Sequence, residues 1–149
     1  MADPAVRSGG RRGHRPKPTT VLAVDLGAGS GRVAAVTARD DGLDLEVIHR
    51  FPNQPVDVRG SLHWDVLALY SQVRTGIGLG RTLQPASLGV DAWGVDFALL
   101  DGSGELLGNP HHHRDRQFVG ALARLFRRVD RSLIYGRTGI QFLPFNTSV

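Results

Sequence analysis

The first third of the chain alternates short apolar runs with turn residues, a pattern typical of strands. Residues 21–24 are apolar and largely β-branched, and residues 33–38 form a second apolar run, so both are predicted to be buried strands. From Leu43 to Phe51 apolar and polar positions alternate, which predicts a third strand with one solvated face. Residues 40–42 supply the turn before it. These spacings predict three strands in meander order.

The hydrophobic period changes after the third strand. Residues 52–61 are polar and contain prolines, so they are predicted to form a loop. Apolar residues then recur at helical spacing over 66–77, and this stripe would cover one face of the sheet. Asp65 is the predicted N-cap of the helix, and Gly78 and Gly80 are predicted to end it.

Strand and helix signals alternate in the rest of the chain. Residues 88–91 and 95–100 are predicted strands, and the glycine-containing segment 101–104 is a predicted hairpin turn. An amphipathic helix with arginines on its outer face is predicted over 118–129, followed by a short helix over 130–135. Three strands, a helix, and then further strands and helices indicate an α/β fold with a mixed sheet.

The turn between the first two strands carries the strongest chemical signal. Three glycines at alternate positions between 27 and 31 let backbone N–H groups approach an anion closely. Asp25 stands at the strand end, where a carboxylate can hold Mg²⁺ through water, and Ser30 and Arg32 suit phosphate oxygens. The pattern matches neither a Walker loop nor a Rossmann fingerprint. A glycine-rich hairpin that binds nothing is the structural alternative.

A second candidate site covers residues 89–97, Gly-Val-Asp-Ala-Trp-Gly-Val-Asp-Phe. Trp93, Gly94 and Asp96 combine an indole, a glycine and a carboxylate. Sugar sites use this combination, because an aromatic ring covers the apolar face of the ligand while polar groups meet its hydroxyls. In the structural alternative, Trp93 belongs to the core, Gly94 serves a turn and Asp96 caps a strand.

Three consecutive histidines at 111–113 raise the question of a metal site. Adjacent residues of an extended segment point to opposite sides, so only His111 and His113 can share an ion, and no third ligand is implied. The preferred interpretation is a loop that presents Arg114 and Asp115 to an internal salt bridge or to a ligand.

The net charge of +4 is concentrated at the N-terminus. Residues 1–18 hold five basic residues against one acid, whereas basic and acidic residues balance from residue 19 onward. The first 18 residues are therefore predicted to be a disordered tail, and the neutral body gives no sign of a nucleic-acid function. With no cysteine and no long apolar run, the chain is predicted to have no disulfide and no membrane span and to be cytoplasmic.

Five segments occur in the order found in FGGY-type carbohydrate kinases, and they are residues 25–32, 63–65, 89–97, 114–115 and 137–147. The chain resembles the rhamnulokinase branch most. For that branch the strings Ala-Trp-Gly-Val-Asp-Phe and Gly-Ile-Gln-Phe-Leu-Pro-Phe-Asn-Thr are nearly signatures. The resemblance runs from about Val21 to the last residue and omits the tail.

The resemblance implies a fold and a reaction. The fold would be an α/β domain of the ribonuclease H-like, actin/hexokinase-type ATPase class, with a mixed sheet that opens with a three-strand meander and is incomplete at the C-terminus. Residues 19–149 would be the N-terminal part of the first kinase domain. ATP and Mg²⁺ would be the cofactors, and the γ-phosphoryl group of ATP would pass to the 1-hydroxyl of L-rhamnulose.

The same resemblance implies residue roles. Asp25 matches the acid beside the magnesium ion, and Gly94, with Trp93 and Asp96 around it, matches a sugar-contacting position. The positions that match the phosphate-binding residues are Ala28, Gly29, Ser30, Gly31 and Arg32.

Two expectations limit the assignment. The family's catalytic aspartate and adenosine-binding segments are expected beyond Val149, so no catalytic residue is assigned in this chain. Ala92 and His113 stand where many relatives have threonine and tyrosine. Kinases of neighbouring sugars, such as fuculose or xylulose, and a catalytically silent fragment therefore stay open as alternatives.

Overall fold

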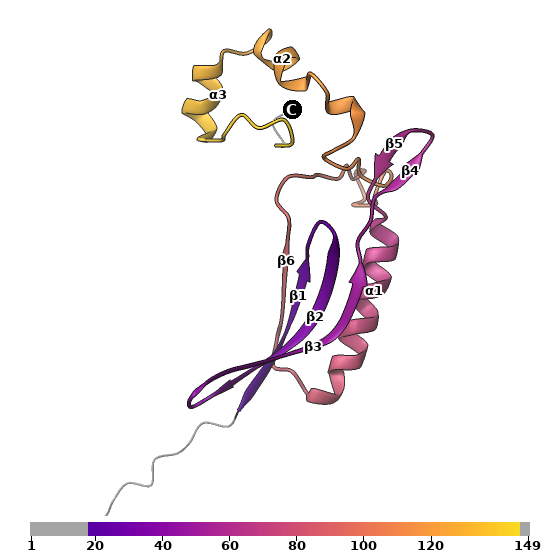
Figure 1. The fold of residues 1–149 in the computed structure, drawn as a ribbon, viewed down its shortest axis with the longest axis vertical. Helices are drawn as coiled ribbons and strands as arrows, with labels where there is room; N and C mark the ends of the chain where they lie inside the picture. The colour runs from indigo at the N-terminus through magenta and orange to yellow at the C-terminus, as the bar shows by residue number, and fades with distance from the viewer. Residues whose placement is uncertain (1–17, 147–149) are drawn as a thin grey trace, which may run out of the picture.

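The computed structural model describes residues 18–146, and its centre is a four-stranded mixed sheet (Figure 1). β1 (Thr19–Leu26), β2 (Ser30–Arg39) and β3 (Gly42–Pro52) form the antiparallel meander predicted from the sequence. β6 (Leu88–Ala92) pairs with β1 and runs parallel to it, so the strand order is β3-β2-β1-β6. The tail predicted for the first 18 residues lies outside the described residues, apart from its last position.

A single long helix covers one face of this sheet. α1 (Val66–Gly80) packs against β1, β2 and β3 and continues into the 3₁₀ helix η1 (Arg81–Leu83). The Asp65 carboxylate caps α1 as predicted, by accepting a backbone N–H of the first turn at 3.0 Å. A Cβ added at Gly76 would lie 2.4 Å from the Val33 side chain, so glycine is needed for the close approach. The buried apolar residues of the sheet are Leu22, Val24, Val33, Ala34, Ala35 and Phe51.

A short hairpin replaces part of the loop predicted over 52–61. It consists of β4 (Val56–Val58) and β5 (Ser61–His63). Its two central turn residues have φ angles of 55° and 82°, and the Asp57 carboxylate accepts the N–H of Gly60 at 2.6 Å. Turn geometry and a side-chain cap thus stabilise strands too short for sequence periodicity to reveal.

The strand predicted over 95–100 is wrong. Of the residues 95–100, Leu100 alone forms a β-bridge in the described part of the chain, and its partner is Leu106. The chain bends at Gly94 and Val95, and across this bend the indole N–H of Trp93 donates to the carboxylate of Asp96 at 2.5 Å. The bend turns the chain away from β6, so residues 96–99 do not continue the sheet.

The helix predicted over 118–129 is interrupted. The structure divides the region into the 3₁₀ helix η2 (Arg116–Phe118) and the shorter α2 (Ala121–Phe126). Gly120 separates them, with a φ of 74° that a continuous right-handed helix does not accept.

The next helix, predicted over 130–135, exists but extends further. α3 (Arg131–Thr138) begins after Asp130, whose carboxylate accepts a backbone N–H at 2.7 Å. It continues until Gly139, which adopts the left-handed conformation with a φ of 64°. Like every other helix of residues 18–146, α3 does not meet the length and apolarity that a membrane span requires.

Candidate functional site

The two segments with predicted chemistry leave the sheet at the same edge. β1 and β6 are parallel neighbours, and Leu26 lies opposite Ala92 in their register. The β1–β2 turn follows Leu26, and the bend that holds Trp93 and Gly94 follows Ala92. Figure 1 shows the turn and the end of β6 directed toward the same end of the sheet. Ligands of open α/β sheets bind outside the carboxyl ends of the strands, which is where these segments lie.

Asn53, directly after β3, holds the β1–β2 turn in shape. It is 3% exposed, and its side-chain amide donates to the carbonyl of Gly27 at 2.8 Å. Its backbone N–H donates to the carbonyl of Gly29 at 3.2 Å. The turn also closes on itself, through a bond of 3.1 Å from the N–H of Gly27 to the carbonyl of Ser30. Two carbonyls of the turn are therefore already bound to Asn53.

The amide groups at the tip of the turn are available to a ligand. Ala28 and Gly29 are exposed, and their N–H groups donate to no residue among those described. A Cβ at Gly29 would meet nothing within 4 Å, whereas one at Gly31 would lie 2.3 Å from the Phe51 ring. Gly31 thus serves packing, and the free amides at the tip are of the kind that binds phosphate oxygens.

Three charged residues lie beside this turn on neighbouring strands. Arg32 lies opposite Asp25 in the β1–β2 register, and its Nη2 contacts the carboxylate at 2.8 Å. Asp91 lies opposite Asp25 on the other side, in the β1–β6 register. The Nε of Arg32 is buried and has no hydrogen-bond partner in the described part of the chain. The partly exposed guanidinium of Arg32 suits a phosphate, and the two carboxylates on adjacent strands suit a Mg²⁺ ion.

The carboxylate of Asp96 joins three ring side chains. Its Oδ2 accepts the indole N–H of Trp93 at 2.5 Å and that of Trp64 at 2.7 Å, and it lies 3.0 Å from Nδ1 of His113. The side chains of Asp96 and His113 are each 9% exposed. Three donors on one oxygen fix the directions of all three rings.

Stacked rings surround this carboxylate. His112 is 3% exposed and lies between Trp64 and His113, with ring centroids 4.2 Å from each. Burial, and then the repulsion that a protonated His113 would exert, lower the pKa of His112. Its Nδ1 accepts the backbone N–H of Arg114 at 3.0 Å, which requires that nitrogen to be unprotonated. His112 is therefore a neutral spacer in the stack.

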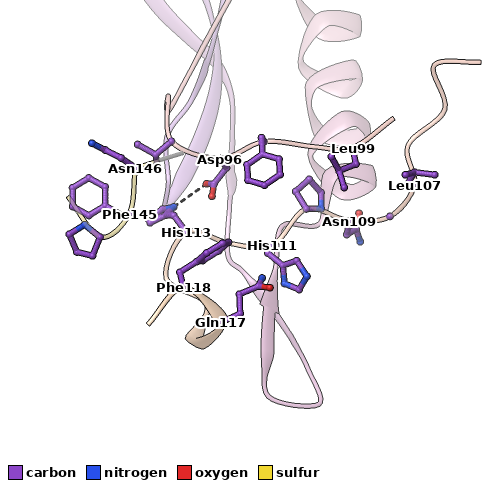
Figure 2. A pocket seen from close by; sticks show the side chains of 15 residues that line it. Asp96, Leu99, Leu107, Asn109, His111, His113, Gln117, Phe118, Phe145 and Asn146 are labelled. Carbon is purple, nitrogen blue, oxygen red and sulfur yellow. Dashed lines mark hydrogen bonds and ion pairs between the residues drawn. The ribbon is translucent and has the colours of Figure 1, made fainter. Parts of the chain in front are cut away.

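A cavity of about 310 Å³ opens beside Asp96 and His113 (Figure 2). The side chains of Asn109, Gln117 and Asn146 add polar groups to its wall, and phenylalanine and leucine side chains supply the apolar part. This volume is at the lower end of the range for small-molecule sites. Asp96 also borders an apolar groove of about 410 Å³ between α1 and β6, which Trp93 lines.

The histidine run divides between two different contacts. His111 stacks on His63, with ring centroids 4.3 Å apart, and lies 3.2 Å from the hydroxyl of Ser61. His113 instead contacts Asp96. Among residues 18–146, no group of three or more side chains is arranged to hold a metal ion.

Asp115 anchors the loop that follows the histidines. It is buried, and its carboxylate accepts the hydroxyl of Ser61 at 2.9 Å and the N–H groups of Leu62 and Gln117 at 2.5 Å and 2.8 Å. Burial alone would raise the pKa of Asp115, but these bonds outweigh it and hold the pKa below its ordinary value. These partners are neutral groups, so Asp115 joins β5 to η2. Within residues 18–146 the internal salt bridge, one of the two alternatives predicted for Arg114 and Asp115, is not formed, and the alternative of a ligand stays a prediction.

The predicted sugar-site residues are only partly brought together. Trp93 and Asp96 are bonded to each other, whereas Gly94 is exposed and lines neither the cavity nor the groove. Sequence reasoning missed Asn53 and Trp64, whose partners lie 26 and 32 positions away. The available signal was composition, because Trp64 is one of only two tryptophans in the chain.

Known proteins similar to this chain include bacterial rhamnulokinases. No family model matches the chain. It is 47% identical over 128 residues to a rhamnulokinase of Bacteroides thetaiotaomicron and 44% identical over 131 residues to one of Pectobacterium carotovorum. Both alignments cover 85% of this chain and 26% of the relative. The chain thus spans about a quarter of the length of the curated relatives it matches.

Solved structures of sugar kinases share the fold. A gluconate kinase from Lactobacillus acidophilus matches with a TM-score of 0.68 at 15% identity, over 87% of this chain and 26% of its own. A Plasmodium falciparum glycerol kinase with ADP matches with a TM-score of 0.63 at 13% identity, over 87% and 27%. These identities show the fold alone, and it is the predicted actin/hexokinase-type α/β class. Together, the comparisons show that residues of this chain are similar in sequence to about a quarter of the length of bacterial rhamnulokinases and share the fold of sugar kinases.

Proposed function

We propose that this chain supplies the N-terminal part of the first domain of an ATP-dependent sugar kinase, over residues 19–149. The full enzyme would transfer the γ-phosphoryl group of ATP to the 1-hydroxyl of L-rhamnulose. The observation that carries the proposal is the β1–β6 register, because it puts the phosphate turn and the sugar segment at one edge of the sheet. The rhamnulokinases that are 47% and 44% identical support the choice of sugar.

The β1–β2 turn would hold the phosphates of ATP with residues 28–32. The free N–H groups of Ala28 and Gly29 would donate to phosphate oxygens, and the Ser30 hydroxyl would add a further donor. Arg32 would neutralise phosphate charge while its Nη2 stays on Asp25, 2.8 Å away. Phosphoryl transfer depends mainly on positioning and charge stabilisation, and these groups supply both.

The sugar would bind beside Asp96, which lines the cavity, and Trp93 would act on it through its bond to Asp96. The cavity of about 310 Å³ has room for a small sugar and offers both apolar and polar wall groups. The rings bonded to Asp96 keep its carboxylate in a fixed direction. A preorganised acceptor of this kind costs little reorganisation when a hydroxyl binds.

Asp25 and Asp91 are the residues that would hold Mg²⁺. They lie opposite each other on adjacent parallel strands, and Mg²⁺ in phosphoryl-transfer sites takes one or two carboxylates and several waters. When bound, the ion neutralises charge on the phosphates. We propose no catalytic base within this chain, because the resemblance assigns that role to an aspartate outside it. We assign the base to a part of the enzyme beyond Val149.

A chimera tests this function directly. The matching segment of the Bacteroides thetaiotaomicron rhamnulokinase is replaced by this chain, and ADP release is measured with L-rhamnulose, fuculose and xylulose. We expect release that depends on L-rhamnulose, and Arg32→Ala should lower kcat about 10- to 100-fold, as the loss of a charged hydrogen bond does. A folded chimera that releases no ADP with any sugar would refute the proposal, and a preference for fuculose or xylulose would correct the substrate.

A further inference from the structure

The contacts of Asp96 fix the position of one proton on His113. Both indole nitrogens on Oδ2 can only donate, so this oxygen acts as an acceptor. The proton in the third contact, 3.0 Å long, therefore lies on Nδ1 of His113. In a neutral imidazole with a protonated Nδ1, the other nitrogen, Nε2, carries a lone pair and only accepts. No residue of 18–146 hydrogen-bonds to this Nε2.

The His113 ring is held in this orientation. It stacks on His112 with an interplanar angle of 26°, and the edge of Phe145 lies 6.5 Å away between centroids. Turning the ring over would place a carbon against Asp96 and break the hydrogen bond. Because the side chain is only 9% exposed, water could replace little of that bond.

Asp96 supplies a second unused acceptor beside the first. All three donors end on Oδ2, and Oδ1 accepts no hydrogen bond from the described residues. Asp96 and His113 both line the cavity of about 310 Å³, and Figure 2 shows them side by side at its wall. When His113 is neutral, these two cavity-lining side chains, each about nine-tenths buried, therefore hold two unused acceptor atoms, Oδ1 and Nε2.

We propose that His113 is a neutral, specificity-determining residue, whose Nε2 accepts a hydrogen bond from one sugar hydroxyl while Asp96 Oδ1 accepts one from the adjacent hydroxyl. Two adjacent acceptors select a pair of donors, and they disfavour a keto or deoxy position, which has no proton to give. For the identity of the sugar, this inference rests on the proposed function.

The chain carries its own reporter for this test. Its two tryptophans, Trp64 and Trp93, both donate to Asp96, so tryptophan emission reports on the wall of the cavity. The 149-residue chain is titrated with L-rhamnulose, and with fuculose and xylulose in parallel. We expect a saturable change with L-rhamnulose. His113→Asn keeps a donor for Asp96 but has no atom in place of Nε2, so it should weaken binding about three- to tenfold.

Two further variants and one spectrum separate this role from a structural one. His113→Phe loses both contacts and should bind more weakly still, whereas His49→Asn, the same substitution in β3 at a histidine that does not line the cavity, should bind like wild type. A ring-nitrogen spectrum of the ¹⁵N-labelled chain at neutral pH should show the proton of His113 on Nδ1. Unchanged binding by His113→Asn, a proton on Nε2, or no saturable response to any of the sugars would each overturn the inference.

The result also separates this inference from the proposed function. If the chimera phosphorylates L-rhamnulose and His113→Asn changes neither its KM nor the binding constant of the chain, only the inference fails. If the chimera phosphorylates no sugar while the chain binds one and His113→Asn weakens that binding, the kinase proposal fails and the role of His113 stands.

Discussion

Asn53 is the residue on which the shape of the candidate phosphate turn depends most directly. Asn53→Ala removes the bond of 2.8 Å to the carbonyl of Gly27 but keeps the backbone bond to Gly29. Leaving a buried acceptor unpaired costs about 1–3 kcal/mol, and Gly27 is half-buried, so water replaces part of the bond. We therefore expect the free energy of unfolding to fall by about 1–2 kcal/mol.

The neighbouring residue provides a matched control. Gln54 also donates to this turn, to the carbonyl of Gly29, but over 3.4 Å and from an exposed position. Gln54→Ala should therefore change the free energy of unfolding by less than about 0.5 kcal/mol. Urea unfolding measures both variants, and a shift in midpoint at constant m-value isolates the stability change.

A loosened turn should also bind nucleotide more weakly, because its free amides must then be ordered by the ligand. In the chimera, Asn53→Ala should raise the KM for ATP more than the KM for sugar, whereas Gln54→Ala should change neither. Equal stability losses in the two variants, or an unchanged KM for ATP in a destabilised Asn53→Ala enzyme, would contradict the argument that Asn53 positions the phosphate-binding amides.

Two further predictions concern the scaffold. Gly76→Ala forces a methyl to within 2.4 Å of Val33, whereas the methyl of Gly78→Ala meets nothing within 4 Å. Both substitutions gain the same helix propensity, so the free energy of unfolding of Gly76→Ala should be about 1–3 kcal/mol lower than that of Gly78→Ala. The pKa of His112 lies below its ordinary 6.5, so the unfolded chain binds more protons. The contribution of His112 to the free energy of unfolding should thus be complete above pH 6.5 and should decline as the pH falls below it. Urea midpoints measured at about pH 5.5 and 7.5 would show this decline, and His112→Phe should reduce it.

Local patterns predicted the elements whose signals are local. The meander, the Asp65 cap and the start of α3 depend on hydrophobic period and on capping residues, and the structure has all three. The strand predicted over 95–100 failed because the apolar residues there do not pair within a sheet. The chain bends at residues 94–95 just before them, and hydrophobic periodicity does not register such a bend.

Residues that shape the candidate site were harder to find in the sequence than residues proposed to contact a ligand. Ala28 and Gly29 could be found because an exposed glycine turn has a recognisable composition. Asn53 and Trp64 could not, because each acts on a backbone or side-chain group distant in the chain. Such partners become neighbours only once the sheet register and the end of α1 are fixed.

The two halves of the candidate site share one design, which separates binding groups from the residues that hold them. In the first half, Asn53 binds the carbonyls of the turn, so that the N–H groups stay available to phosphate. In the second half, Trp64 and Trp93 bind one oxygen of Asp96, so that the other oxygen stays available to a hydroxyl. In both halves a hydrogen bond inside the protein orients a group that is left without a partner. Substitutions at Asn53 or Trp64 should therefore weaken ligand binding although neither residue is proposed to contact the ligand.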